Sequence, residues 1–390
     1  MKKVLVLGGG FAGVEAAIYL KKEENIEVTL VSDRDYFYIY PTSIWIPTGQ
    51  TTEKDISIPL EQLATKHGFE VIVDAVTALD AGAKSAMLAS GRVLEGYDYI
   101  VVALGQDKMK AKGIENTFSI CGKPEEAGEI KLRLDILVAK GSGKIAMGFG
   151  GNPHDTSAVR GGPAFEVLFN VNTMLKRKGI RDNFELTFFA PMEKPGQKMG
   201  PKALVMMDKM FGMTNIKKKV GSKITSFEAD GINFEDGTKL ESDLTMFITA
   251  GKGHSVLEAS DLPLSEAGFV VTNEYNEVEG FEGVYAIGDS ASLMGPEWRA
   301  KQGHVAEVMA KNVAYNIFQH SQKMKSKRSY MEHLNILCVM DTGDGAAFVY
   351  RDDKGGKMIP LPFIGHWMKR GWGWYCKQSK LGRIPRIPGM

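Results

Sequence analysis

The sequence has few cysteines, almost no net charge and no long apolar run. Three cysteines in 390 residues cannot build a disulfide framework, so any cysteine function is chemical. A formal net charge of +1 argues against an electrostatic nucleic-acid binder. No stretch approaches about 20 uninterrupted apolar residues, which argues against a transmembrane helix. The first residues already read as a strand, so we expect no signal peptide. We also expect no metal site.

The amino-terminal residues show the pattern of a dinucleotide-binding unit. An apolar run over residues 3–7 predicts a buried strand, and Gly8, Gly10 and Gly13 follow it at G-x-G-x-x-G spacing before a helical segment. The first glycine of such a unit permits a tight turn, the second lets the backbone approach the pyrophosphate, and the third lets helix and strand pack closely. The helix terminus adds free N–H groups. We therefore predict a dinucleotide cofactor here.

Later residues specify FAD as that cofactor. Ser32 and Asp33 follow the second predicted strand, where an acidic residue takes the ribose hydroxyls. Gly105 ends another apolar strand. Gly288 and Asp289 follow a buried strand and open a turn, as in flavoproteins whose aspartate accepts a hydrogen bond from the ribityl chain. Together with the glycine fingerprint, this second signal predicts FAD.

Two further segments bear on the ligands. The aromatic segment 35–45, which includes Pro41, suits the wall of a flat aromatic ligand, although an aromatic minicore would give the same pattern. A second strand-turn-helix unit begins at residue 144, but its turn lacks the third glycine. Pro153 falls where the helix should begin, and the next strand offers no ribose carboxylate. We therefore do not expect NAD(P)H to bind there.

The carboxy-terminal tail differs from the rest of the chain. No acidic residue follows Asp353. On a helical wheel, aromatic and apolar residues gather on one arc: Ile364, Trp367, Met368, Trp372, Trp374 and Tyr375. Cations gather on the opposite arc: Lys369, Arg370, Lys377 and Lys380. This predicts an interfacial membrane helix whose cations meet anionic lipid. The alternative is a helix packed on the body of the protein.

Taken together, these motifs resemble the sulfide:quinone oxidoreductase family, within the flavoproteins that have two dinucleotide-binding domains. The matching motifs are Gly8–Gly13, 35–41 with Trp45, 161–166, Tyr285–Asp289, Lys301–His304 with 307–310, and Cys338 with Asp341. The resemblance implies FAD as cofactor, oxidation of sulfide at cysteines on one flavin face, and reduction of a quinone on the other. It also implies attachment to membrane lipid through the carboxy-terminal helix, and so a peripheral, monotopic protein of the inner cell membrane. We expect a homo-oligomer.

The implied fold is α/β, with two interleaved Rossmann-like domains and a carboxy-terminal amphipathic membrane-binding region. We assign residues 1–110 and 245–325 to the FAD-binding domain. Residues 111–244 form the second domain, with a degenerate nucleotide site. Residues 326–390 form the quinone- and membrane-binding region.

The resemblance also assigns catalytic residues. Cys121 and Cys338 match family cysteine positions, and a third family cysteine is absent, with Arg160 near its place. We therefore expect Cys121 and Cys338 to be the active pair. Glu166 is the candidate proton donor or acceptor near the sulfur. Arg160 either lowers a thiol pKa and holds HS⁻, or is a surface arginine. Cys376 is expected to be a structural thiol.

For the quinone we expect a site between apolar tail residues such as Phe363 and Ile364. Lys301, which is also expected beside the cofactor, or His304 would supply protons. Three other functions stay open: a type II NADH:quinone oxidoreductase, the flavoprotein subunit of a flavocytochrome c sulfide dehydrogenase, and a membrane-bound flavin-dependent sensor without turnover. An anaerobic titration of the flavin with sulfide and then with NADH separates them.

Overall fold

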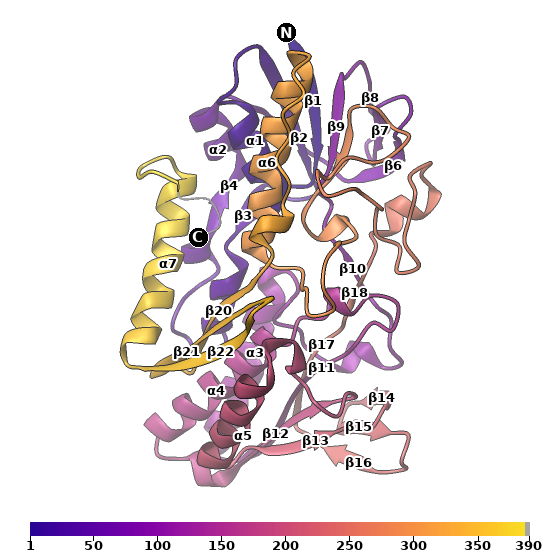
Figure 1. Ribbon diagram of the computed structural model, residues 1–390. Helices are drawn as coiled ribbons and strands as arrows, with labels where there is room; N and C mark the ends of the chain where they lie inside the picture. Colours follow the sequence, from indigo (N-terminus) through magenta and orange to yellow (C-terminus); the bar gives the residue numbers. More distant parts are fainter. Residues whose placement is uncertain (387–390) are drawn as a thin grey trace.

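The computed structural model describes residues 1–386, in two α/β domains and a carboxy-terminal unit that lies along both (Figure 1). The predicted α/β class is confirmed. The last four residues of the region predicted over 326–390 lie outside the described residues.

The first domain is built on a five-stranded parallel sheet. Its order is β19-β9-β1-β2-β5, with bounds Val284–Ala286, Tyr99–Val102, Lys2–Leu7, Ile26–Ser32 and Glu70–Val73. Helices α1 (Phe11–Leu20) and α6 (Gly303–Ser321) pack against each other beside this sheet. The central strand β1 is apolar and buried from Val4 to Leu7, and its neighbour β9 is buried along its whole length, because both faces of the sheet are covered.

Smaller elements complete this domain. A three-stranded antiparallel sheet contains β6 (Val76–Asp80), β7 (Ser85–Leu88) and β8 (Val93–Leu94). The short strands β3 (Tyr36–Tyr38) and β4 (Ser57–Pro59) pair beside helix α2 (Leu60–His67). Between β3 and β4 the aromatic segment forms the 3₁₀ helix η1 (Tyr40–Trp45).

The second domain has a four-stranded parallel sheet in the order β13-β12-β11-β17. The bounds are Lys217–Val220, Phe184–Ala190, Gly143–Phe149 and Leu244–Ile248. Its helices are α3 (Pro124–Lys140), α4 (Gly162–Arg177) and α5 (Pro201–Thr214). A small antiparallel sheet of β14 (Ile224–Glu228), β15 (Gly231–Phe234) and β16 (Lys239–Glu241) flanks it.

The predicted domain boundary at residue 245 is wrong. Strand β17 pairs in parallel with β11 from Ile145↔Leu244 to Phe149↔Ile248, so it belongs to the second sheet. The chain crosses between domains through two antiparallel strands, β10 (Asp107–Lys108) and β18 (Gly251–Lys252). The apolar, glycine-ended pattern of β17 resembled β9 because both strands are fully buried and pair in parallel, although β17 is the last strand of its sheet.

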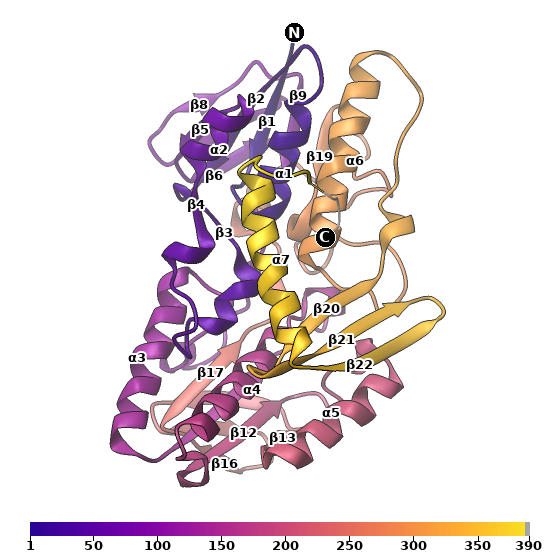
Figure 2. The same ribbon diagram turned by 90° about the vertical axis from the view of Figure 1, so that its left-hand side faces the viewer.

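The carboxy-terminal unit consists of three antiparallel strands and one helix. The strands are β20 (Ile336–Asp341), β21 (Gly345–Asp352) and β22 (Gly355–Pro362), and the helix is α7 (Ile364–Lys380). Helix α7 packs on these strands and on η1, and it runs from them towards the first domain (Figure 2). None of the helices within residues 1–386 has the length and apolar character needed to cross a membrane.

Candidate functional site

One cavity of about 1860 Å³ lies where the two domains and α7 meet. Single-ligand pockets are usually ~300–1,000 Å³, so this cavity has room for a dinucleotide and further substrates. Most predicted cofactor residues line it: Gly8, Gly10, Ser32, Asp33, Pro41, Gly105, Gly288, Asp289 and Lys301. So do Cys121, Cys338, Glu166 and His304.

The glycine fingerprint fits a dinucleotide pyrophosphate. Gly8 has φ +119°, in the left-handed region that favours glycine. A Cβ at Gly13 would lie 1.8 Å from the Gly8 carbonyl oxygen, so this glycine allows the close packing of helix on strand. A Cβ at Gly10 would meet no atom within 4 Å, which leaves open cavity beside the backbone at the start of α1. The backbone roles predicted for Gly8 and Gly13 agree with this geometry, and contact of Gly10 with a pyrophosphate stays a prediction.

The predicted ribityl-binding turn is held by cations. Asp289 forms an ion pair with Arg160, which comes from the second domain. The Lys301 ammonium donates to the Asp289 carbonyl at 3.0 Å and to the Ala291 carbonyl. Burial lowers the pKa of Lys301 to about 8. Burial also lowers the pKa of His304 to about 4, so this imidazole is neutral at pH 7.

The two predicted catalytic cysteines line the same cavity but have different neighbours. Both are free thiols. Cys121 accepts a hydrogen bond from the Tyr40 hydroxyl, and burial raises its pKa while the charge of Arg160 opposes that rise. Burial raises the pKa of Cys338 to about 12, and nearby Glu166 contributes to the rise. Their action as a pair stays a prediction.

A buried ion pair joins the second domain to α7 at this cavity. Glu166 on α4 pairs with Lys369 on α7, and their side chains are 4% and 7% exposed. Glu166 also accepts the backbone N–H of Asp341 at 2.9 Å. Burial raises the pKa of Glu166 above its ordinary value although Lys369 opposes the rise. A buried carboxyl of raised pKa beside an ammonium can hold and deliver a proton.

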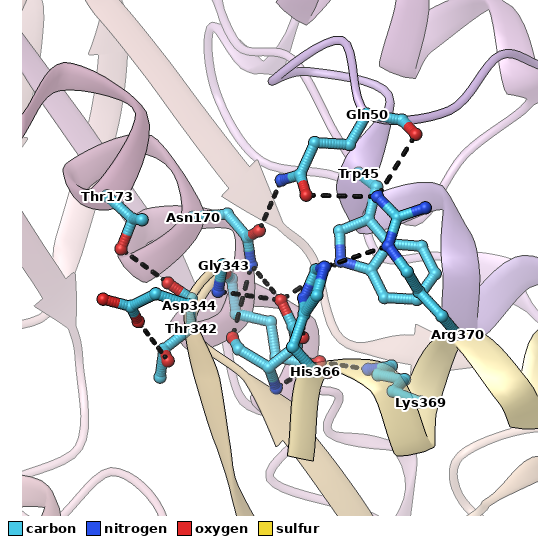
Figure 3. A network of polar contacts seen from close by, with 12 residues as sticks. Trp45, Gln50, Asn170, Thr173, Thr342, Gly343, Asp344, His366, Lys369 and Arg370 are labelled. Atoms are coloured by element: carbon cyan, nitrogen blue, oxygen red, sulfur yellow. Dashed lines mark hydrogen bonds and ion pairs between the residues drawn. The ribbon is translucent and has the colours of Figure 1, made fainter. Parts of the chain in front are cut away.

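Asp341 is the centre of a second polar cluster behind this pair (Figure 3). Its carboxylate accepts hydrogen bonds from four donors: Trp45 Nε1 (3.1 Å), Asn170 Nδ2 (3.0 Å), Gly343 N (2.9 Å) and His366 Nδ1 (2.7 Å). Burial alone would raise the pKa of Asp341, but the bonds from His366 and Trp45 lower it. Arg370 donates to the other nitrogen of His366 at 2.9 Å, which fixes the proton on Nδ1.

A third cluster fixes the far end of α7. The Glu15 and Glu307 carboxylates lie on α1 and α6, and both pair with Lys380 and with Arg386. All four side chains are at most 6% exposed. Cys376 is fully buried nearby, as predicted, and burial raises its pKa to about 12.

The structure corrects two predictions about the tail. Lys369 and Lys380 do not face lipid, because both are buried against carboxylates of the domains. Phe363 and Ile364 do not line the cavity, since they are 77% and 60% exposed. The tail residues that do line it are Met368, Lys369, Gly371, Trp372 and Tyr375. The packed-helix alternative therefore describes the polar face of α7.

Several site residues were not predicted. The sequence placed Tyr40 and Trp45 only in the aromatic segment that suits the wall of a flat ligand, gave His366 no role, and gave Lys369 a lipid-facing one. One signal could have found Lys369: the tail contains cations but no acids after Asp353, while Glu166 lies in an apolar helix that must be buried. A buried carboxylate is stable when a cation pairs with it, and the tail supplies cations that have no acidic residue near them in the sequence.

Comparison with known proteins finds related flavoproteins. The sequence profile described as "Pyridine nucleotide-disulphide oxidoreductase" matches residues 2–311. The chain is 28% identical to the sulfide-quinone reductase of Aquifex aeolicus, covering 90% of this chain and 84% of that one. The crystal structure of the sulfide:quinone oxidoreductase from that bacterium superposes with a TM-score of 0.88 at 25% identity, covering 99% of this chain and 93% of the other.

Other relatives use a different reductant. A type II NADH:quinone oxidoreductase of Staphylococcus epidermidis is 24% identical over 91% of this chain and 92% of its own length. The predicted resemblance to sulfide:quinone oxidoreductases is confirmed, and so is FAD as the cofactor. The chain belongs to the pyridine nucleotide-disulphide oxidoreductase family of flavoproteins.

Proposed function

We propose that this flavoprotein oxidises sulfide to sulfane sulfur or polysulfide and passes the electrons through FAD to a quinone. One observation carries the proposal: a single cavity contains the FAD-binding glycines, both cysteines and the Glu166–Lys369 pair beneath α7. A thiol, a flavin and a buried proton carrier are the groups that a sulfide-to-quinone transfer needs.

The residues divide the work as follows. FAD supplies the two-electron chemistry when bound. Cys121 and Cys338 hold sulfur, as the family resemblance implies. Glu166 and Lys369 hold one of the two protons that reduction of a quinone to a quinol consumes, and we place the quinone head group beside them, against Met368 and Trp372. This position replaces the one predicted at Phe363 and Ile364.

We further propose that the outer face of α7 rests on membrane lipid. Phe363, Ile364, Trp367 and Trp374 are each at least 60% exposed and lie along one side of this helix. Exposed tryptophans are typical of side chains at a membrane interface. A quinone dissolved in that membrane would reach the cavity beneath the same helix. A second copy of the chain on this face is the competing explanation, and vesicle binding by a monomer would exclude it.

The test is an anaerobic titration of the holoprotein, followed by its flavin spectrum. Sulfide should bleach the oxidised flavin, and a water-soluble quinone should restore it. Cys338→Ala should lose the bleaching by sulfide and keep bound FAD. Retention of full sulfide-dependent quinone reduction by Cys338→Ala would refute the role of this cysteine.

One observation favours a second candidate, NADH:quinone oxidoreduction. The cavity extends along the second domain to Gly151 and Asn152, where that domain would hold a nucleotide, and relatives at 23–24% identity are NADH enzymes. Against it, the helix after β11 begins only at Gly162, and no ribose carboxylate follows β12. Bleaching of the flavin by NADH in the same titration would decide for this candidate.

A further inference from the structure

Arg160 reaches from the second domain into the FAD-binding domain. It stands in the irregular segment between β11 and α4, near the place of the family cysteine that this chain lacks. Its guanidinium pairs with Asp289 and lies over the Tyr40 ring, with Cζ 5.4 Å from the ring centre. With its side-chain oxygen turned towards Arg160, the Gln106 amide accepts from Nε and Nη2 at 3.1 and 3.2 Å.

These contacts place a fixed positive charge beside a thiol. The Tyr40 hydroxyl donates to the Cys121 sulfur, and a donor to sulfur favours the thiolate over the thiol. Burial raises the pKa of Cys121, and the charge of Arg160 is the strongest influence that opposes the rise. Arg160 keeps 27% of its side chain exposed and lines the cavity, so its side chain borders the space that a small anion would enter.

We infer that Arg160 is the anion-holding residue of the sulfur site, which binds hydrosulfide and stabilises the Cys121 thiolate. The inference rests on the proposed function, since it names the charged form of that substrate. An arginine stays protonated at every physiological pH and has five N–H donors, of which Asp289 and Gln106 occupy some. Asp289 offsets part of the positive charge of Arg160, so we expect a moderate effect of that charge on the pKa of the Cys121 thiol.

The test measures the ionisation of Cys121 directly. In a Cys338→Ser, Cys376→Ser background, holoprotein is alkylated with iodoacetamide over a range of pH, and the rate gives the thiolate fraction. Arg160→Gln should raise the apparent pKa of Cys121 by about one unit, which is about a tenfold slower alkylation below that pKa. Arg160→Lys should keep most of the rate. The matched control is Arg351→Gln, because Arg351 lines the same cavity and should leave Cys121 unchanged.

An unchanged alkylation profile in Arg160→Gln would overturn the inference. If that variant loses FAD, Tyr40→Phe replaces it: removal of the hydroxyl donor should also slow alkylation, and an unchanged rate would count against the cluster. In turnover, Arg160→Gln should raise the KM for sulfide about tenfold, and Arg160→Lys should keep it near the wild-type value. Absence of any sulfide turnover in the wild type would refute the proposed function and the hydrosulfide half of the inference, while the alkylation rate alone decides whether Arg160 stabilises the Cys121 thiolate.

Discussion

Replacement of Lys369 by methionine tests the buried ion pair to which we assign the proton. Methionine has a similar length but no charge, so Lys369→Met leaves Glu166 buried without its cation. Removal of one partner from a buried pair costs about 3–5 kcal/mol of unfolding free energy when the other stays charged. Both side chains are at least 93% buried, so the full penalty applies.

The loss should depend on pH because Glu166 can take up a proton. Burial already raises its pKa and Lys369 opposes the rise, so Lys369→Met raises the pKa further. A carboxyl with a higher pKa in the folded state stabilises the fold at low pH. That stability falls as pH rises, by about 1.4 kcal/mol per unit. Relative to the wild type, the loss should therefore be small near pH 5, where Glu166 can hold its proton in both proteins, and should grow towards about 3–5 kcal/mol near pH 8.

The assay is urea unfolding of the holoprotein near both pH values, followed by circular dichroism. The matched control is Lys377→Met, on the same helix, whose ammonium donates to the Asp55 carbonyl at 2.6 Å. This control should lose about 1 kcal/mol or less at either pH. An equal loss for Lys369→Met at both pH values would refute the reasoning, since it would show that Glu166 takes up no proton.

The remaining predictions concern α7. Trp367→Ser with Trp374→Ser should weaken sedimentation with phosphatidylcholine vesicles at least tenfold, while Leu132→Ser on exposed α3 should not, because only the tryptophans bury aromatic area in lipid. Asp341→Asn leaves four donors with a poorer acceptor. It should therefore raise the KM for quinone and speed proteolytic cleavage near α7. Unchanged values of both would show that the Asp341 carboxylate does not hold α7 in place. Cys376→Ser should leave sulfide oxidation intact and lower thermal stability; loss of activity with normal stability would contradict its structural role.

The cofactor side of the site could be predicted because its signals are local. Gly8, Gly10 and Gly13 act within one turn, and each has a backbone reason that a spacing rule captures. Asp289 lies in the turn just after β19, so the sequence pattern could also predict its place at the cavity. The domain boundary was not, because β17 pairs with a strand about 100 residues earlier and its own residues do not state which sheet it joins.

The polar cluster around Asp341 could not be predicted for a similar reason. Three of its four donors come from η1, α4 and α7, which are separated by more than 100 residues of sequence. Each residue alone is unremarkable for its type: a tryptophan in an aromatic segment, an asparagine in a helix, a histidine in an amphipathic tail. Only the tertiary arrangement turns them into donors to one carboxylate (Figure 3).

Helix α7 shows what a helical wheel does and does not determine. The wheel separated an aromatic arc from a cationic arc, but it could not say which arc meets the protein. Charged residues are placed in solvent by default because they are rarely buried unless paired. Here the partners exist, because the buried carboxylates of Glu166 and Glu15 form ion pairs with Lys369 and Lys380. With those cations turned inward, anionic lipid has less to attract it, and the exposed tryptophans become the main contribution to membrane binding. Binding to anionic vesicles should therefore change little with salt, whereas the wheel alone would have predicted a steep dependence.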